Sequence, residues 1–302
     1  MKLTDALEDF IFQCECRRLS PQTIRNYQKQ VTYLLDYLRI QHQITELEEV
    51  TPQMVKQYLL EMQKKGRKPA YLNDLLKAFK CFFRYVWEEE YIDRLITAKI
   101  KNVRQPKVII KTFSNLQVRQ LINYYHNTTY LDVRNKTLIT LFFDTGMRLG
   151  EVINLTEKDI KRDFILVRRG KGEKERVVPK SPYLAKQLFR YERVKEGYFQ
   201  DRAIPYANYF LSKNGKPLTS EAVEKMLRVA GEDLGMEDVR VSPHTCRHTF
   251  AQMQLRNGLD VYSLSRLMGH ENISITQRYL EGLRDQEIVT AGVRTSPLMN
   301  LL

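Results

Sequence analysis

The stretch from Ser242 to Leu280 carries side chains that could bind and attack a phosphate group. It contains two imidazoles, a guanidinium and a phenol, in the order His244, Arg247, His270 and Tyr279. Pro243 suits the first turn of a helix, where its missing N–H is no loss. His244 and Arg247 are three residues apart and would therefore share one face of that helix.

The second half of this stretch places the other two side chains. Gly269 follows an apolar helical run, where a C-terminal cap is expected, and leaves His270 in the turn. Tyr279 is expected on the next short helix, beside the cationic Arg278. These groups can converge on one anion, and a phosphodiester is the obvious candidate.

The order and spacing of these residues resemble the tyrosine recombinase (phage integrase) family, whose core is His-x-x-Arg, then Gly-His, then Tyr. Residues 145–151, Thr-Gly-Met-Arg-Leu-Gly-Glu, look like the segment that carries the family's first arginine. Residues 170–176, Gly-Lys-Gly-Glu-Lys-Glu-Arg, look like its lysine-bearing β-hairpin. The resemblance implies a catalytic set, supported by Glu151, that consists of Arg148, Lys171, His244, Arg247, His270 and Tyr279.

Two of these residues are guanidiniums, which suit a phosphate under attack. Attack on phosphorus builds charge on the non-bridging oxygens, which a pair of arginines can hold bidentately. Arg148 and Arg247 fit this role, and the loss of one such donor typically costs about 2.7–4 kcal/mol of barrier. The alternative for Arg148 is a surface ion pair with Glu151. Within the full set, Glu151 is expected to orient or support the arginine pair.

Tyr279 is the candidate nucleophile. A phenol has an ordinary pKa of about 10, so nearby guanidinium and imidazolium charge is expected to stabilise its phenolate form. Members of the family form a 3′-phosphotyrosine and release a 5′-hydroxyl, and the stored bond lets strand exchange run without ATP or magnesium. The resemblance therefore implies that no cofactor is needed.

The leaving oxygen needs a proton, and Lys171, at the expected tip of a glycine-flanked hairpin, could supply it. A plain phosphate contact is the alternative role for Lys171, and Lys174 is a rival acid that the sequence does not separate from it. His244 and His270 are candidate donors or bases near neutral pH. His248 is expected to be a structural, hydrogen-bonding histidine.

The sequence argues against two cofactor classes. His244, Cys246, His248 and His270 include potential zinc ligands, but Cys246 would face away from the two helical histidines and no fourth ligand is evident. The chain contains no Gly-x-x-x-x-Gly-Lys-Ser/Thr loop for a nucleotide. We expect no metal site.

Composition indicates the partner and the compartment. At 302 residues the chain is long enough for two domains, and its formal net charge of +13 favours a polyanionic partner. No apolar run approaches the roughly 20 residues of a membrane span, and the first residues lack a secretory signal. The four scattered cysteines are expected to be reduced thiols of a cytosolic, cytoplasmic protein. Nucleic acid is therefore favoured over an anionic membrane face, and the resemblance implies double-stranded DNA, with no membrane, as the partner.

Residues 1–104 are expected to form an all-helical domain. Helix starts are marked by proline at Ser20-Pro21, Thr51-Pro52 and Lys68-Pro69, with apolar residues at helical spacing behind each. Leu19 to Tyr27 also resembles the start of the family's core DNA-binding (SAM-like) domain. Residues 105–111 are basic, contain Pro106 and are expected to be an interdomain linker. The resemblance implies a strap across the DNA backbone, and the alternative is an ordinary basic loop.

The polar faces of these helices carry the candidate DNA contacts, since a basic stripe along a duplex releases counterions. The candidates are Arg17, Arg25, Lys29, Lys65, Arg67, Lys68 and Lys77, with Lys107 in the linker. The alternative for each of them is an ordinary solvated helix surface. Their clustering at helix ends and turns favours contact with phosphate.

The second domain is expected to span residues 112–302 and to be mainly α with a small β-hairpin. Ser114 can cap its first helix. The other predicted elements are a buried helix around 138–143, an amphipathic segment at 146–155, a hairpin from 164–167 and 176–178, and helices at 184–194 and 221–234, the last capped by Ser220.

Beyond Tyr279 the chain ends in an apolar segment, Pro297-Leu298-Met299-Asn300-Leu301-Leu302. A frayed end is one interpretation. In the family, the segment after the tyrosine packs on a neighbouring protomer. That implies docking in trans and a dimer-to-tetramer assembly on paired inverted core sites, with accessory proteins as further partners.

We therefore expect a site-specific DNA recombinase or integrase, similar to Xer-type recombinases or to compact integrases of mobile elements, with a slight preference for the mobile-element group. Two rival functions stay open. A type IB topoisomerase-like enzyme would share the chemistry without partner exchange, and a non-catalytic DNA-binding regulator would use the fold alone.

Overall fold

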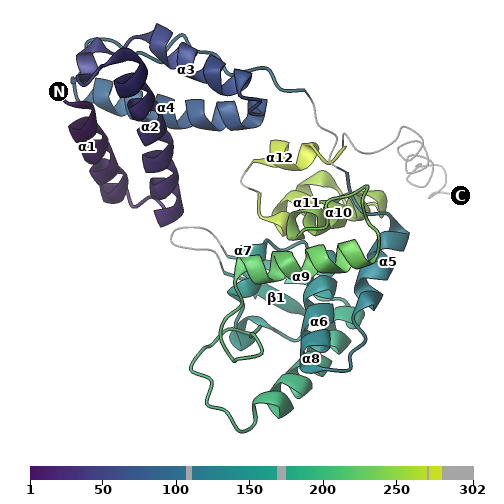
Figure 1. Ribbon diagram of the computed structural model, residues 1–302. Coiled ribbons are helices and arrows are strands. Elements are labelled where there is room, and N and C mark those ends of the chain that lie inside the picture. The colour runs from purple at the N-terminus through teal and green to yellow at the C-terminus, as the bar shows by residue number, and fades with distance from the viewer. Residues whose placement is uncertain (107–110, 169–174, 271, 281–302) are drawn as a thin grey trace, which may run out of the picture. The chain divides into compact units, whose positions relative to one another are not determined.

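The computed structural model describes residues 1–106, 111–168, 175–270 and 272–280. The chain divides into two compact units, Met1–Lys107 and Val108–Leu302. Figure 1 shows the helices of both units, and each unit has a hydrophobic core of its own. The fold class is as expected from the sequence, mainly α-helical with one small β-hairpin.

The named secondary-structure elements in the described part of the N-terminal unit are all helical. Its elements are α1 (Leu3–Cys16), α2 (Pro21–His42), the 3-10 turn η1 (Leu47–Glu49), α3 (Pro52–Lys64) and α4 (Pro69–Glu88). The three predicted helix starts are confirmed, because α2, α3 and α4 each carry proline at their first position. Ser20 caps α2 by accepting a hydrogen bond from the backbone N–H of Thr23.

The C-terminal unit contains the hairpin and the remaining helices. They are α5 (Asn115–Tyr124), α6 (Tyr130–Thr145), α7 (Leu149–Ile153), η2 (Glu157–Asp159), β1 (Phe164–Val167), β2 (Arg176–Pro179), α8 (Pro182–Phe199), α9 (Ser220–Asp233), α10 (Pro243–Arg256), α11 (Val261–Met268) and α12 (Ile273–Gln277). Helix α6 is buried along most of its length, and α8 and α10 pack against it. The predicted buried helix around 138–143 is thus confirmed.

The hairpin forms with antiparallel register, in which Phe164 pairs with Pro179 and Val167 with Arg176. The β-branched runs on either side of the Gly-Lys-Gly turn therefore pair as predicted. The turn itself, with Lys171 and Lys174, lies outside the described residues, as do Lys107 and the tail from 281 to 302.

Two local predictions need correction. Helix α9 is capped by Thr219, not by Ser220, because the Thr219 hydroxyl accepts from the N–H of Ala222. Tyr279 does not lie on the short helix after His270: α12 ends at Gln277, and Tyr279 sits in the turn that follows. The cap at Gly269 is confirmed, with φ of 63° in the left-handed region.

Several predicted boundaries also differ from the structure. Helix α8 is longer than the predicted 184–194, because Ser181 caps it and Pro182 opens it. Helix α7 is shorter than the predicted 146–155, because Arg148 has extended backbone at its N-cap. No helix in the described ranges is long and apolar enough to cross a membrane.

Candidate active site

Helix α10 buries the second candidate arginine at the centre of the site. Its start is set by Pro243 and by the Ser242 hydroxyl, which accepts from the N–H of Thr245. Arg247 is only 4% exposed. Its Nη1 donates to the carbonyl of Gly146 (2.6 Å) and its Nη2 to the carbonyl of Met268 (2.7 Å). The guanidinium is therefore held from two sides before any ligand binds.

Gly146 makes this contact possible through its own conformation. It ends α6 with φ of 60°, a region that favours glycine. A Cβ added there would lie 2.2 Å from Cδ1 of Phe250 on α10. Helices α6 and α10 therefore approach closely at this point, and the Gly146 carbonyl faces Arg247.

Arg148 stands at the N-cap of α7, where Glu151 supports it. Its N–H donates to Oε2 of Glu151 (2.8 Å), and its Nη1 forms an ion pair with Oε1 (3.0 Å). Its Nη2 donates to the carbonyl of Gly269 (3.1 Å). The ion pair that was the alternative interpretation of Arg148 is thus present, and the same guanidinium also reaches the turn that carries His270.

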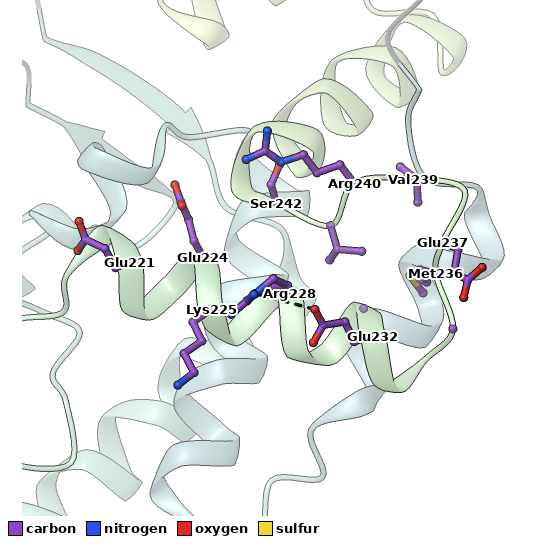
Figure 2. Close-up of a pocket in the computed structure, with 13 residues that line it drawn as sticks. Glu221, Glu224, Lys225, Arg228, Glu232, Met236, Glu237, Val239, Arg240 and Ser242 are labelled. Atoms are coloured by element: carbon purple, nitrogen blue, oxygen red, sulfur yellow. Dashed lines mark ion pairs between the residues drawn. The ribbon is translucent and has the colours of Figure 1, made fainter. Parts of the chain in front are cut away.

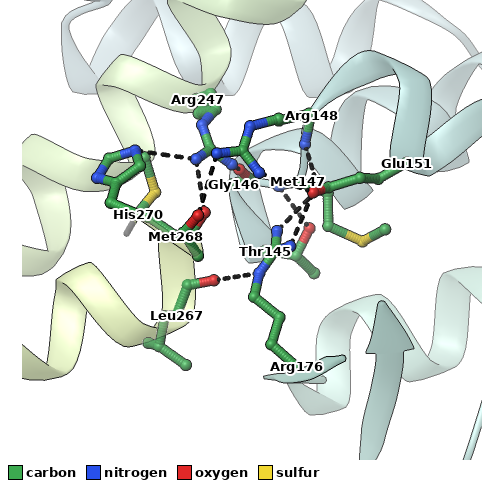
Figure 3. A network of polar contacts seen from close by, with 11 residues as sticks. Thr145, Gly146, Met147, Arg148, Glu151, Arg176, Arg247, Leu267, Met268 and His270 are labelled. Atoms are coloured by element: carbon green, nitrogen blue, oxygen red, sulfur yellow. Dashed lines mark hydrogen bonds and ion pairs between the residues drawn. The ribbon is translucent and has the colours of Figure 1, made fainter. Parts of the chain in front are cut away.

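A third arginine, missed from the sequence, completes this network. Arg176, the first residue of β2, donates from Nε to the carbonyl of Leu267 (2.7 Å). Three consecutive carbonyls at the C-terminal end of α11 thus accept from three arginines (Figure 3). The pairs are Leu267 with Arg176, Met268 with Arg247 and Gly269 with Arg148. The last carbonyls of a helix lack intrahelical partners, and its C-terminus favours cations, so this end of α11 gathers the guanidiniums.

The carboxylate of Glu151 lies between two of these arginines. Arg176 grips it with two bonds, Nη1 to Oε1 (2.7 Å) and Nη2 to Oε2 (2.8 Å). Burial alone would raise the pKa of Glu151, but the hydrogen bonds and charges of Arg176 and Arg148 outweigh burial and lower this pKa to about 2. Glu151 is thus ionised at any working pH. For Arg247, burial and the charge of Arg148 lower the pKa to about 10, so it stays charged near neutrality.

His270 lies beside Arg247 in the turn predicted for it. Its Nε2 is 3.1 Å from Nη2 of Arg247, and its Nδ1 is 2.8 Å from the hydroxyl of Thr276. The ring therefore bridges the buried guanidinium and α12.

Tyr279 comes from the same chain and packs beside these groups. Its ring lies 6.3 Å from the His270 ring, nearly parallel, and joins a small apolar cluster with Phe250, Leu264 and Met268. Burial raises the pKa of Tyr279, although the charges of Arg247 and Arg148 act in the opposite direction. The expected stabilisation of the phenolate by positive charge is therefore present but smaller than the cost of burial in the protein without DNA.

His244 and His248 form a ring pair on α10 that contacts the tyrosine. Their ring centroids are 4.0 Å apart, and His248 lies 5.2 Å from the Tyr279 ring. The buried part of the His244 ring and the charge of Arg247 lower the pKa of this histidine. The prediction of a hydrogen-bonding role for His248 is wrong for one atom, because its buried Nδ1 has no partner among the described residues. Its pKa falls to about 4, chiefly through burial, so the ring is neutral.

The candidate DNA contacts of the N-terminal unit are all exposed where the structure describes them. They are Arg17 at the end of α1, Arg25 and Lys29 on α2, Lys65, Arg67 and Lys68 in the turn between α3 and α4, and Lys77 on α4. Some have local partners, since Lys65 pairs with Glu61 (2.5 Å) and Arg67 lies over the Tyr71 ring. Lys107 lies outside the described residues.

Arg84, a basic residue near Lys77 on α4, was also missed from the sequence. Lys77, Lys80 and Arg84 line a cavity of about 360 Å³ on one face of α4. Asn73, at the same cavity, holds the chain after α4 by pairing with the N–H and carbonyl of Val103 (2.7 and 2.9 Å). The spacing of three and four residues could have identified Arg84, because it puts all three cations on one helix face.

A larger cavity, of about 630 Å³, lies between α9 and the chain from Gly235 to Ser242 (Figure 2). None of the candidate catalytic residues lines it. Among the described residues there is no group of three or more His, Cys, Asp or Glu side chains that could hold a metal ion.

Each of the two units matches a known protein family or domain. Residues 111–285 match the model of the phage integrase family, and residues 11–90 match the phage integrase N-terminal SAM-like domain. The chain belongs to the phage integrase family, the tyrosine-type site-specific DNA recombinases.

Its relatives include Xer proteins. It is 30% identical to tyrosine recombinase XerD of Lacticaseibacillus casei over 96% of this chain and 98% of the relative. XerD of Halalkalibacterium halodurans is 28% identical over 90% and 91% of the two chains. A crystal structure of XerH recombinase bound to palindromic difH DNA shares the fold, with a TM-score of 0.76 and 19% identity over 92% of this chain and 81% of XerH.

Proposed function

We propose that this chain cuts and rejoins DNA at specific sites through a covalent bond between Tyr279 and a DNA 3′-phosphate. One arrangement carries the proposal. Arg148 and Arg247 donate to neighbouring carbonyls at the end of α11, His270 contacts Arg247, and Tyr279 of the same chain lies where both arginine charges act on it. Two guanidiniums beside a phenol match the needs of attack on a phosphodiester.

In the proposed step, the phenolic oxygen of Tyr279 attacks phosphorus and the bond from phosphorus to the 5′ oxygen breaks. Arg148 and Arg247 stabilise the charge that builds on the non-bridging oxygens. We assign the phenol proton to the neutral ring of His244, whose pKa is lowered by burial and by Arg247.

The 5′ oxygen takes its proton from Lys171 or Lys174, both of which lie outside the described residues. Attack by the 5′-hydroxyl of another strand then reverses the step and restores the backbone. Because the phosphotyrosine conserves the energy of the broken bond, we assign no role to ATP or a metal.

We assign the two units different tasks on DNA. Residues 1–104 would bind the duplex through the basic residues of α2, α4 and the turn between α3 and α4. Residues 105–111 would form the strap to the catalytic domain, residues 112–302, so that the two domains clamp the duplex.

The same proposal extends to the oligomer that forms on DNA and to the cellular compartment. The apolar tail would dock on a neighbouring protomer in a dimer or tetramer on paired inverted sites, and accessory proteins would join there. The palindromic DNA bound by XerH supports such paired sites. A DNA substrate also favours the cytoplasm as the compartment.

The test is a plasmid that carries two copies of a candidate site from the gene's own neighbourhood. We expect recombinant circles with the unchanged protein and none with Tyr279→Phe. Relaxation of supercoils without sequence preference and without recombinants would instead favour the topoisomerase-like rival. Full activity of Tyr279→Phe would favour the non-catalytic regulator. Sites from a dimer-resolution locus and from mobile-element ends, tested in parallel, separate the two host roles.

A further inference from the structure

The guanidinium of Arg176 joins three elements of the C-terminal unit at one point. It lies at the start of β2, holds both carboxylate oxygens of Glu151 from α7 and donates to the carbonyl of Leu267 at the end of α11. All three of its nitrogens are therefore engaged. This planar, forked geometry is one that lysine cannot reproduce.

The ion pair of Arg176 is shielded from solvent, whereas a second ion pair of the same hairpin is not. The side chains of Arg176 and Glu151 are 9% and 11% exposed. In the second pair, Asp159 is 3% exposed, but Arg168, which follows β1 and lies 2.5 Å away, is 56% exposed. Both members of the first pair are shielded from water, whereas the arginine of the second is not, so the Arg176 pair is the stronger constraint on geometry.

Glu151 passes this constraint on to Arg148. Its two oxygens accept from the backbone N–H and from Nη1 of Arg148 as well as from Arg176. The charged groups that act on Glu151 in the described chain are Arg148 on α7, Arg176 on β2 and Arg247 on α10. Without Arg176, Glu151 would lose the largest opposing charge, and its protonated form would no longer hold Arg148 as an anion does.

The carbonyl of Leu267 passes the same constraint on to the other end of the site. It precedes the carbonyls of Met268 and Gly269, which orient Arg247 and Arg148. His270 follows directly. An unpaired Leu267 carbonyl would loosen the helix end on which both candidate phosphate-binding arginines rest.

We propose that Arg176 is a positioning residue for strand cleavage, which fixes Arg148 through Glu151 and fixes the end of α11 before His270. The inference rests on the proposed function. Arg176 itself need not touch the phosphate, so its effect should appear in the rate of cleavage and in the pH dependence of that rate, and not in DNA affinity.

The experiment is single-turnover formation of the covalent adduct on a nicked suicide duplex, measured from neutral to weakly acidic pH. Arg176→Met should cleave between about tenfold and a hundredfold more slowly than the unchanged protein at neutral pH, with DNA affinity retained. The deficit should deepen as pH falls, because Glu151 then titrates. Arg176→Lys should restore part of the rate, and Arg168→Met should behave like the unchanged protein.

Equal rates and equal pH profiles for the unchanged protein, Arg176→Met and Arg176→Lys would overturn the inference. A uniform loss that is the same at every pH and accompanies a lower melting temperature would also overturn it, since that is the signature of a merely structural role. If Arg176→Met does not fold, the cleavage rate and pH profile of Arg176→Lys are compared with those of the unchanged protein instead. Failure of the unchanged protein to form any adduct would instead defeat the proposed function.

Discussion

Nη2 of Arg247 lies 3.1 Å from Nε2 of His270, and this contact favours one tautomer of the imidazole. A guanidinium has donors and no acceptor, so Nε2 must accept and cannot carry a proton. The proton is then on Nδ1, which donates to the hydroxyl of Thr276 (2.8 Å). The two contacts together therefore favour the tautomer of His270 that carries its proton on Nδ1, toward α12.

Thr276→Val should disturb that tautomer. Thr276 is fully buried, and valine keeps its shape while removing the acceptor of the Nδ1 proton. We expect cleavage to slow by about tenfold or more, as is seen when the partner that fixes a catalytic histidine is changed. Single-turnover cleavage and ¹⁵N chemical shifts of His270 measure the effect.

Thr140→Val is the matched control for this change. Its hydroxyl is also buried but has no hydrogen-bond partner in the described part of the chain. The control should leave cleavage unchanged. Equal rates for the two variants would show that the Thr276 hydroxyl does not matter.

Gly146→Ala should damage the site through its backbone. The new Cβ would meet the Phe250 ring at 2.2 Å, at a φ of 60° that alanine rarely adopts. We expect a loss of stability of about 1–3 kcal/mol and a larger loss of cleavage, because the Gly146 carbonyl would move away from Arg247.

Gly150→Ala tests the same sequence motif without the clash. Apart from its chain neighbours and the backbone of its own helix, no atom lies within 4 Å of a Cβ at Gly150, and its φ is not in the left-handed region. Thermal melting and cleavage of the two variants should therefore differ clearly. An intact Gly146→Ala protein with normal cleavage would contradict the described approach of α6 to α10.

Glu151→Gln should make the free energy of unfolding less dependent on pH in the acid range. The pKa of Glu151 is lowered from 4.5 to about 2, since its arginine partners outweigh burial. Its ionised form therefore stabilises the fold fully above about pH 4.5, and this contribution is lost as pH falls toward 2. At neutral pH we expect the variant to be less stable by about 3 kcal/mol, because it leaves charged partners unpaired.

Calorimetry at neutral and at acid pH measures this difference. The gap between Glu151→Gln and the unchanged protein should shrink as the solution becomes more acidic. A gap of constant size would mean that the carboxylate is not held by Arg176 and Arg148.

Replacing both Lys77 and Arg84 by alanine should lower the affinity for DNA and make that affinity less sensitive to salt concentration. Both line the basic cavity on α4. If each neutralises one phosphate, the slope of log affinity against log salt should fall by about 2 in the double alanine variant. Lys56→Ala, an exposed lysine of α3, is the control. An unchanged slope would remove α4 from the DNA surface.

Local patterns in the sequence predicted much of the fold. Prolines at helix starts, apolar stripes and the paired β-branched runs each act within a few residues, so the helices of the N-terminal unit and the hairpin follow from them. The Thr219 cap and the turn at Tyr279 were missed, because neighbouring residues offered equally good local patterns.

The candidate site was predictable as a set of residues but not as a network. Arg176 and Glu151 are 25 residues apart, and no spacing rule joins a strand to the start of a short helix. Likewise, sequence reasoning assigned positive charge around Tyr279 but could not weigh it against burial in the cluster with Phe250 and Met268. Both depend on tertiary packing.

The most direct test is to map the residue that becomes linked to DNA. The unchanged protein is incubated with a nicked suicide duplex, digested with protease and analysed by mass spectrometry. The account predicts a nucleotide on the peptide that contains Tyr279, no adduct with Tyr279→Phe and a normal adduct with Tyr262→Phe, a change at an exposed tyrosine of α11. An adduct on any other residue, or one that persists in Tyr279→Phe, would contradict it.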